Sequence, residues 1–126
     1  MATQQLPQSV RDYFSAIKAL DAAAFAATFA DDAVQEDPVG TPPNRDHATI
    51  RQFFEGIAVA FTAVELTPDE VFSAGPSMAI RWTGRGTSKG GKTVEFAGID
   101  VIDLDDAGKI KHLRAFWNPG AMMAQL

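Results

Sequence analysis

Three side chains capable of acid–base chemistry occur where the local sequence would keep them away from bulk water: Tyr13, Asp37 and Asp100. Asp37 directly precedes Pro38. A residue before proline is pushed into extended geometry, and proline has no N–H to continue a sheet ladder. We therefore expect Asp37 to lie on a stiff segment where its carboxylate can face a cavity, although an Asp-Pro pair can also simply start a turn.

Asp100 lies in the middle of a strand that the pattern predicts over residues 92–104. Side chains alternate between the two faces of a strand. Asp100 therefore shares its face with apolar neighbours: Val94, Phe96, Ile102 and Leu104. Burial raises the pKa of a carboxyl group, so an acid in this place can stay protonated near neutral pH and donate a hydrogen bond. The alternative is a structural ion pair with a strand arginine: Arg81, Arg85 or Arg114.

Tyr13 is the only tyrosine, and it lies on the apolar face of a helix predicted over residues 7–19. Val10, Phe14 and Ile17 share this face at helical spacing. A buried phenol usually needs a hydrogen-bond partner. Tyr13 is therefore either a functional donor or a core aromatic whose hydroxyl reaches the rim.

The elements that must position these side chains follow from caps and periodicity. Asp21 is expected to cap a short second helix that carries Phe29. Asp31 and Asp32 then end this helix as solvated turn residues, and a strand-like piece covers residues 33–37.

A third helix is expected after its cap at Asp46. Its apolar side chains recur at helical spacing: Ile50, Phe53, Phe54, Ile57 and Phe61. Beyond it the period changes, and glycine-containing turns separate four expected strands: 64–74, 77–88, 92–104 and 109–118. These patterns predict a single α+β domain over residues 1–126, in which three helices cover an antiparallel, hairpin-linked sheet.

The composition restricts the possible functions. The chain is 46% apolar and 21% charged, as in ordinary globular proteins, and its net charge of −5 argues against nucleic-acid or anionic-membrane partners. It has no cysteine and only two histidines, His47 and His112, which we expect at the surface, so no metal site is predicted. We find neither a signal-peptide pattern nor an apolar run of about 18 residues, and expect a cytoplasmic protein.

Five parts of the sequence together form a recognisable pattern: Tyr13, Phe29-Ala-Asp-Asp-Ala-Val-Gln-Glu-Asp-Pro-Val-Gly40, Ile50-Arg-Gln-Phe-Phe54, Gly98-Ile-Asp100 and Leu113-Arg-Ala-Phe-Trp117. With them, nearly the whole chain resembles the ketosteroid isomerases (steroid Δ5-3-ketosteroid isomerases) of the NTF2-like, SnoaL-like superfamily. The Glu-Asp-Pro-Val-Gly run, with a tyrosine 24 positions before its aspartate, is the most specific part. The family fold is a cone, in which a strongly bent mixed sheet wraps around three helices and an apolar cavity.

This resemblance implies an enzyme that moves a carbon–carbon double bond in a 3-oxo-Δ5 steroid or a similar apolar ketone, without a metal or organic cofactor. Asp37 would be the general base, Tyr13 the main oxyanion donor and Asp100 a second, protonated oxyanion donor. The family is a known example of a carboxylic acid kept neutral by an apolar site.

The resemblance also implies residues that wall the substrate cavity: Phe54, Ile80, Trp82, Leu113 and Trp117. It further implies a homodimer through the outer face of the sheet. Phe116, Met122 and Met123 are apolar residues expected outside the cone.

Two departures from the family pattern concern the substrate. Some relatives support the oxyanion tyrosine with further tyrosines, where this chain has Phe29 and Phe54. The glycine-rich hairpin over residues 84–91 does not match the family closely, and its small side chains imply a cavity that is wider or differently shaped. Two alternatives therefore stay open. One is another SnoaL-like enzyme, either a polyketide cyclase or an epoxide hydrolase, the latter with Arg81 or Arg85 pointing inward. The other is a non-catalytic protein that binds an apolar ligand.

Overall fold

The computed structural model describes residues 6–126, so residues 1–5 of the predicted domain lie outside the described part. The helices are α1 (Gln8–Ala19), α2 (Ala22–Ala27), α3 (His47–Ala60) and α4 (Pro119–Met123). The strands are β1 (Phe29–Glu36), β2 (Phe61–Ala74), β3 (Ser77–Ser88), β4 (Thr93–Leu104) and β5 (Ile110–Phe116).

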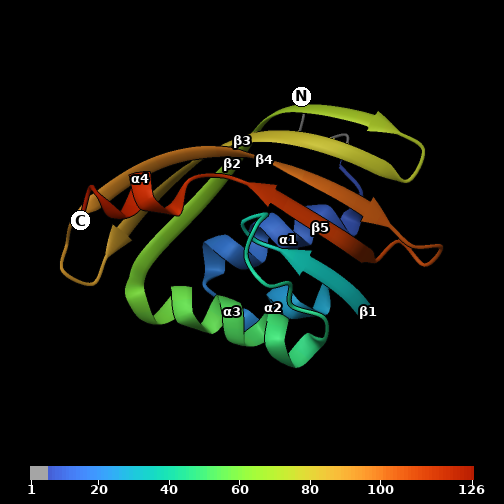
Figure 1. Ribbon diagram of the computed structural model, residues 1–126, viewed down its shortest axis with the longest axis horizontal. Coiled ribbons are helices and arrows are strands. Elements are labelled where there is room, and N and C mark those ends of the chain that lie inside the picture. Colours follow the sequence, from blue (N-terminus) through green and yellow to red (C-terminus); the bar gives the residue numbers. More distant parts are fainter. Residues whose placement is uncertain (1–5) are drawn as a thin grey trace.

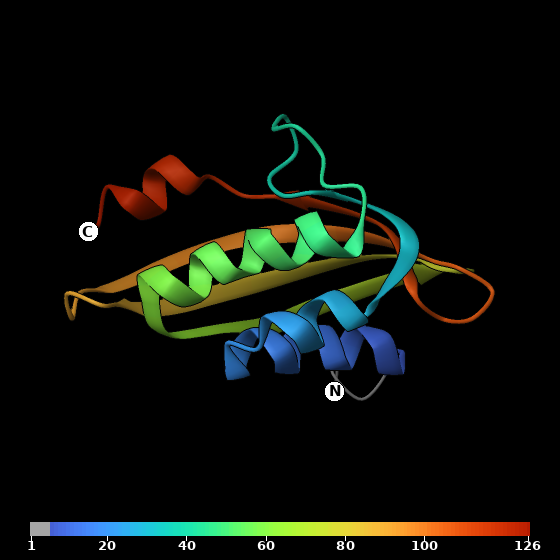
Figure 2. The same cartoon turned by 90° about the horizontal axis from the view of Figure 1, so that it is seen from below.

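The five strands form one mixed sheet in the order β1-β5-β4-β3-β2. β1 and β5 are parallel, while the other neighbours are antiparallel. Helices α1, α2 and α3 lie on one face of this sheet (Figures 1 and 2). The α+β class and the hairpins that link β2 to β5 are confirmed. The four strands predicted from the turns pair in antiparallel fashion, as expected. β1 adds one parallel pair with β5, which is distant in sequence, so the sheet is mixed, as the resemblance implies.

The start of β1 differs from the prediction. α2 ends at Ala27 and β1 begins at Phe29, so Phe29, Asp31 and Asp32 belong to the strand and not to the end of a helix. The pairing with β5 is irregular between Phe29 and Val34, and this irregularity leaves both aspartates exposed. Local periodicity is lost at such an irregularity, which explains why the sequence predicts only the second half of the strand.

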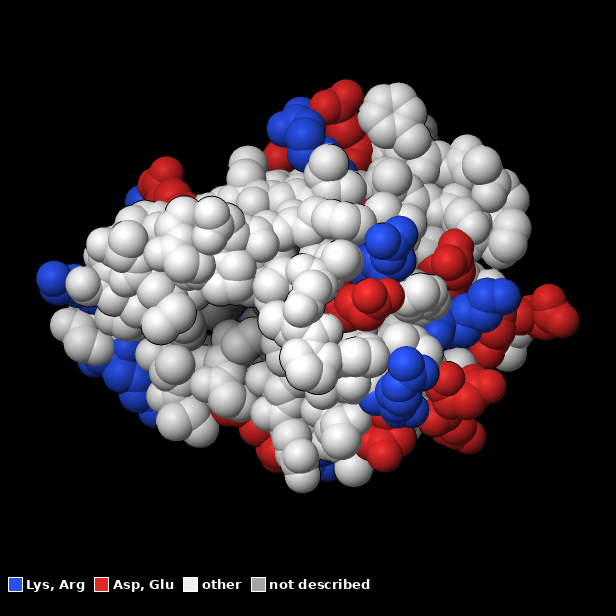
Figure 3. All heavy atoms as spheres, in the orientation of Figure 1, with Lys and Arg blue, Asp and Glu red and all other residues white. Residues whose placement is uncertain are grey.

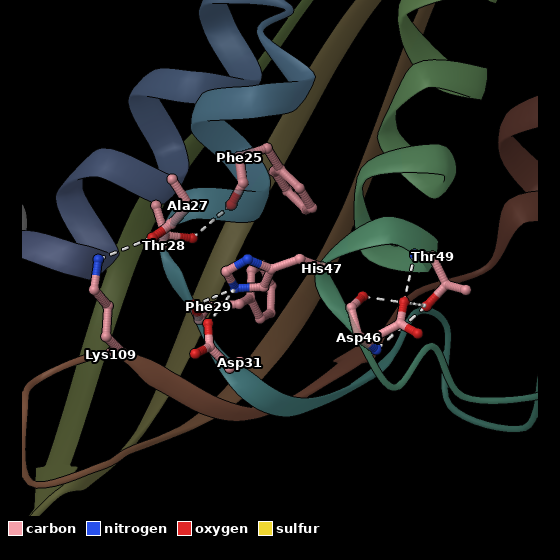
Figure 4. Close-up of polar contacts among 9 residues, drawn as sticks. All are labelled: Phe25, Ala27, Thr28, Phe29, Asp31, Asp46, His47, Thr49 and Lys109. Carbon is pink, nitrogen blue, oxygen red and sulfur yellow. Dashed lines mark hydrogen bonds and ion pairs between the residues drawn. The ribbon is translucent and has the colours of Figure 1, made fainter.

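Helices α1 and α3 follow their predicted patterns. The apolar face of α1 is buried at the expected positions: Val10, Tyr13, Phe14 and Ile17. Asp46 caps α3 through reciprocal hydrogen bonds with Thr49 (Figure 4). α3 ends at Ala60, so Phe61 is the first residue of β2 instead of the last apolar residue of the helix.

Polar contacts join α3 to β1, and α2 to the loop between β4 and β5 (Figure 4). The ring Nε2 of His47, at the start of α3, lies 2.7 Å from the carbonyl oxygen of Phe29. Lys109 Nζ donates to the carbonyl oxygen of Ala27 at the end of α2, over 2.9 Å. His47 lies at the surface, as expected, with its side chain 42% exposed, and its ring is held by this contact.

Helix α4 is absent from the sequence-based prediction. Its N-cap is Asn118, a residue that the prediction assigned to the preceding strand. After the helix, the Gln125 side chain accepts a hydrogen bond from the N–H of Glu95 and donates one to its carbonyl oxygen, at 2.9 and 2.7 Å. These two hydrogen bonds therefore hold the C-terminal segment against β4.

The surface carries charges of both signs. On the face shown in Figure 3, Lys and Arg side chains lie among Asp and Glu, and no continuous basic patch is in view. None of the helices within residues 6–126 is both long enough and apolar enough to span a bilayer.

Two glycines on the inner face of the sheet make room for aromatic rings. A Cβ atom added at Gly84 would overlap the ring of Phe96. One added at Gly98 would lie 2.5 Å from the carbonyl oxygen of Phe116 and 2.7 Å from Cζ2 of Trp82. Of the wider or differently shaped cavity expected from the glycine-rich hairpin, no widening is found at Gly84, because the ring of Phe96 fills the space there.

Gly98→Ala is expected to lower the free energy of unfolding by about 1–3 kcal/mol, because the added methyl group meets backbone and ring atoms in a packed core. Gly56→Ala is the matched control, since Gly56 lies in α3 with open space around it. There alanine should stabilise the helix by about 0.5–1 kcal/mol. Urea titration measures both changes, and a Gly98→Ala protein as stable as the Gly56→Ala protein would contradict this packing.

Candidate active site

A cavity lies between the inner face of the sheet and the helices. Most of its wall is apolar: Ile17, Phe25, Phe53, Phe54, Ile57, Phe61, Val64, Leu66, Trp82, Phe96, Ala115, Trp117 and Met122. Three titratable side chains complete the lining, namely Tyr13 from α1, Asp37 from the segment after β1, and Asp100 from β4. The fold therefore brings together the three residues that the sequence indicated.

The residues predicted to wall the cavity divide into two groups. Phe54, Trp82 and Trp117 line it. Ile80 and Leu113 do not, and both are fully buried in the hydrophobic core. Strand alternation places these two on the inner face correctly, but it carries no information on how far the cavity extends along the strands.

Tyr13 is 2% exposed and packed among phenylalanine rings. Its ring centroid lies 5.3 Å from that of Phe14, 5.2 Å from that of Phe25 and 6.2 Å from that of Phe29. Burial, and after it the nearby charges of Asp100 and Asp37, raise the pKa of Tyr13 well above its ordinary value. The phenol therefore remains protonated and able to donate a hydrogen bond.

Asp100 is 1% exposed, as the strand pattern predicts. Burial, and after it the negative charge of Asp37, raise the pKa of Asp100 to about 8. The hydrogen-bond donors of Trp82 and Tyr13 lower the pKa of Asp100, because they stabilise its charged form. Near neutral pH this carboxyl group is therefore mainly protonated and can act as a donor.

The arginines of the sheet do not neutralise Asp100. They approach other acids: Arg81 with Glu70 at 2.7 Å, Arg85 with Glu95 at 4.0 Å, and Arg114 with Glu36 at 3.7 Å. None of the three arginines is among the described residues that line the cavity. The ion-pair alternative for Asp100 is therefore wrong, and the inward arginine required for the epoxide-hydrolase alternative is not found there.

Asp37 lies at the cavity wall but is less enclosed than Asp100. Burial raises the pKa of Asp37 to about 6, against the effect of a hydrogen bond from Trp117. In this bond the indole Nε1–H donates to Asp37 Oδ1 over 2.7 Å. The preceding Glu36 points elsewhere and lies 2.7 Å from the ring of His112, so His112 is a paired residue of the outer surface.

Met122 is a cavity residue that the sequence-based prediction missed. We expected it outside the cone, but α4 directs it into the lining. Phe116 and Met123 are exposed, as expected. The pair Asn118-Pro119 was the available signal, since a capping residue followed by proline is typical of a helix start.

A metal site is not evident among residues 6–126, where no three acidic or histidine side chains are grouped to bind an ion. The polar groups of the cavity are two carboxyls, a phenol and two indole N–H groups. This set combines groups that can take up a proton with groups that can donate hydrogen bonds.

Residues 10–113 match the SnoaL-like domain family. The chain belongs to the SnoaL-like family. Over 119 residues this SnoaL-like protein is 34% identical to a steroid Delta-isomerase of Nocardioides simplex, with 94% of each chain covered. The resemblance found in the sequence is thereby confirmed.

Solved structures of the fold include enzymes with different chemistry. The Δ5-3-ketosteroid isomerase from Mycobacterium sp. matches with a TM-score of 0.79 at 25% identity, covering 90% of this chain and 93% of that one. The epoxide hydrolase/cyclase-like enzyme SalBIII, which has a role in pyran ring formation in polyether salinomycin, matches with a TM-score of 0.78 at 27% identity, covering 89% of each chain. The NTF2-like fold is therefore shared by isomerases and by other enzymes.

The stability of the protein is expected to decrease with rising pH because of Asp100. The pKa of Asp100 rises from an ordinary value of 3.8 to about 8, so between these values the folded protein binds more protons than the unfolded chain. The stabilisation by the neutral acid is complete below the unfolded pKa and is lost as the pH rises through the folded pKa.

Asp100→Asn removes this titration and should make the free energy of unfolding less dependent on pH. Urea unfolding of both proteins at several values between about pH 4 and pH 9 measures the difference. Because Asp37 and the surface acids are the same in both proteins, their contributions cancel in the comparison. Parallel pH dependences of the two proteins would show that Asp100 is not buried as a neutral acid.

Proposed function

We propose that this SnoaL-like protein is a cofactor-independent isomerase that moves the double bond of a 3-oxo steroid from the β,γ to the α,β position. The observation that supports it is the grouping of Tyr13, Asp37 and Asp100 in one apolar cavity, with the pKa of Asp37 at about 6 and that of Asp100 at about 8. The 34% identity to a steroid Delta-isomerase agrees with this chemistry.

The proposed reaction transfers one proton within the substrate. Asp37, ionised near neutral pH, takes a proton from the carbon between the ketone and the double bond. The C–H electron pair forms a new carbon–carbon double bond, and the carbonyl π electrons move onto the ketone oxygen to give a dienolate. Tyr13 and Asp100 donate hydrogen bonds to that oxygen in a water-poor site. Asp37 then returns the proton two carbons further along, which leaves the double bond conjugated with the restored ketone.

The different surroundings of the two carboxyl groups suit one to act as a base and the other as a hydrogen-bond donor. Asp37 accepts a hydrogen bond from Trp117, which favours its ionised form and suits a base. Asp100 is more completely enclosed and is kept neutral, which suits a donor. Two acids of the same type therefore have a pH interval in which one is charged and the other is not.

A cyclase is the second candidate, because SalBIII is 27% identical over most of the chain. Ring closure onto an epoxide would also use an acid and a base in an apolar cavity. The isomerase is favoured, since a single base beside two donors to one oxygen is the arrangement that enolisation of a ketone requires. The supporting tyrosines of some relatives are replaced by Phe29 and Phe54, both buried here, so the substrate within this class is open to experiment.

With 5-androstene-3,17-dione as substrate, the purified protein should produce the ultraviolet absorbance of a conjugated ketone. Asp37→Asn should lower kcat by about 100-fold to 10,000-fold, the usual contribution of a general base. Tyr13→Phe should lower it by about 100-fold to 1,000-fold, because one oxyanion donor is lost.

Asp32→Asn is the matched control for Asp37→Asn, since Asp32 is an exposed carboxylate of β1, five residues before Asp37. It should retain the activity of the unchanged protein. An isomerisation rate that Asp37→Asn leaves unchanged would rule out the proposed base. Formation of cyclic products from epoxide substrates without steroid turnover would favour the cyclase.

The pH dependence of kcat/KM should be bell-shaped. Activity should rise with the ionisation of Asp37 at about pH 6 and fall with the ionisation of Asp100 at about pH 8. Trp117→Phe removes the donor that lowers the pKa of Asp37, so it should move the acidic limb to higher pH and leave the basic limb in place. A shift of the basic limb alone would contradict this assignment.

We also propose that the protein forms a homodimer through the outer face of the sheet. Ile99 and Phe116 are directly paired across β4 and β5 and are 41% and 40% exposed. Ile99→Lys should yield monomers in sedimentation velocity experiments, because a charge would enter the apolar interface. Val59→Lys is the control, since Val59 is equally apolar but lies on α3. A monomeric unchanged protein would refute the dimer.

A further inference from the structure

Two residues that line the cavity each have a buried polar atom without a hydrogen-bond partner in the described part of the chain. Neither Trp82 Nε1 nor Asp100 Oδ2 has a hydrogen-bond partner among residues 6–126, and both are closed off from solvent. An indole N–H is a donor only, while a carboxyl oxygen can accept. A buried polar atom left unpaired is costly, so each of these atoms is the natural partner of the other.

The register of the sheet places the indole beside the carboxyl group. Ile80 of β3 lies opposite Asp100 of β4, and Trp82 lies two positions further along β3, opposite Gly98. Trp82 and Asp100 are therefore diagonal neighbours on the inner face. Because Gly98 has no side chain, the indole can lie over the backbone of β4, as its 2.7 Å distance from a Cβ added there shows.

Aromatic packing fixes the indole in this place. The ring of Phe96 meets that of Trp82 nearly edge-on, with centroids 5.8 Å apart and an angle of 80° between the planes. Phe96 also packs against Trp117 at 5.7 Å, and the indole N–H of Trp117 is already used by Asp37. Each of the two carboxyl groups in the cavity therefore has its own tryptophan.

We propose that the indole N–H of Trp82 donates to one carboxyl oxygen of Asp100 and so directs the O–H of the other oxygen into the cavity. A protonated carboxyl group has one donor and one main acceptor, and it can rotate unless its acceptor is engaged. With the acceptor engaged by Trp82, the O–H is presented to the ketone oxygen. Trp82 is thus a positioning residue, and its catalytic consequence rests on the proposed isomerase function.

Among the groups around Asp100, Trp82 is the donor that remains to engage its acceptor oxygen. Its neighbours in the ladder are apolar, Ile80 on β3 and Ala115 on β5. The titratable groups that act on it are Tyr13 from α1 and Asp37 from the segment after β1. In the proposed reaction Tyr13 donates to the substrate and Asp37 is the base. The remaining donor that lowers the pKa of Asp100 is Trp82.

Nuclear magnetic resonance of the indole groups tests the contact without any substrate. The chain has two tryptophans, so the ¹⁵N-labelled protein gives two indole N–H signals, and Trp117→Phe identifies which is which. The Trp82 signal should move with a midpoint at about pH 8 and the Trp117 signal with one at about pH 6, following Asp100 and Asp37 respectively. In Asp100→Asn the transition of the Trp82 signal should disappear.

A Trp82 signal that stays constant across this range, or one that titrates equally in Asp100→Asn, would overturn the inference. This measurement needs no Trp82 variant, so a failure of such a variant to fold cannot obscure it. If the titration is present but no steroid is isomerised, the contact stands and the proposed function fails. If steroid is isomerised but the signal does not titrate, the function stands and the inference fails.

Kinetics of Trp82→Phe then test the positioning role, with circular dichroism to confirm folding. Loss of one hydrogen bond should raise the pKa of Asp100 by about half a unit to one unit. The basic limb of the pH profile should therefore move to higher pH, with a lower kcat and little change in KM. A rise in KM with an unmoved basic limb would indicate a packing role alone and contradict the proposal.

Discussion

The burial of the Asp100 carboxyl group is the constraint on which the whole site depends. A carboxylate in an apolar environment is unstable unless a cation or several donors accompany it. Here the sheet arginines approach other acids, and the surroundings supply donors and aromatic rings. The group is therefore kept neutral, and the cavity must exclude water for this to remain so.

Strand β5 sets the relation between the two carboxyl groups. Ala115 pairs with Asp100 in the ladder between β4 and β5. Its carbonyl oxygen accepts a hydrogen bond of 2.8 Å from the N–H of Val39, two residues beyond Asp37. One residue of an interior strand, Ala115, therefore contacts both the segment that carries Asp37 and the strand that carries Asp100. This arrangement suits a reaction in which a proton and a developing negative charge lie on different atoms of one substrate.

The aromatic residues of the cavity act as a connected group. Phe96 packs between Trp82 and Trp117, and Gly84 and Gly98 provide the space that the rings of Phe96 and Trp82 occupy. The glycines therefore serve close packing around the site, and they do not enlarge it. Apolar rings make up most of the cavity wall, while the indole N–H groups of Trp82 and Trp117 lower the pKa of the carboxyl groups beside them.

Sequence periodicity was sufficient to place Asp100 on a buried strand face and Tyr13 on a buried helix face, because alternation and helical spacing depend only on neighbouring residues. The same local rules identified the caps Asp21 and Asp46 and the antiparallel hairpins. They failed at Phe29, where pairing with a parallel strand far along the chain creates β1. The resemblance implied that Ile80 and Leu113 wall the cavity, but both lie in the core, because their depth depends on the helices above them.

By itself, the sequence determined which side chains of α1 and of the strand that carries Asp100 face inward, and which family the chain resembles. Only the tertiary structure decided which inward residues reach the cavity and that Met122 forms part of its wall. It also decided that each carboxyl group has a tryptophan beside it. The reason is physical. The orientation of a side chain is set by its own backbone, whereas distance, dryness and hydrogen-bond partners arise where separate strands and helices meet.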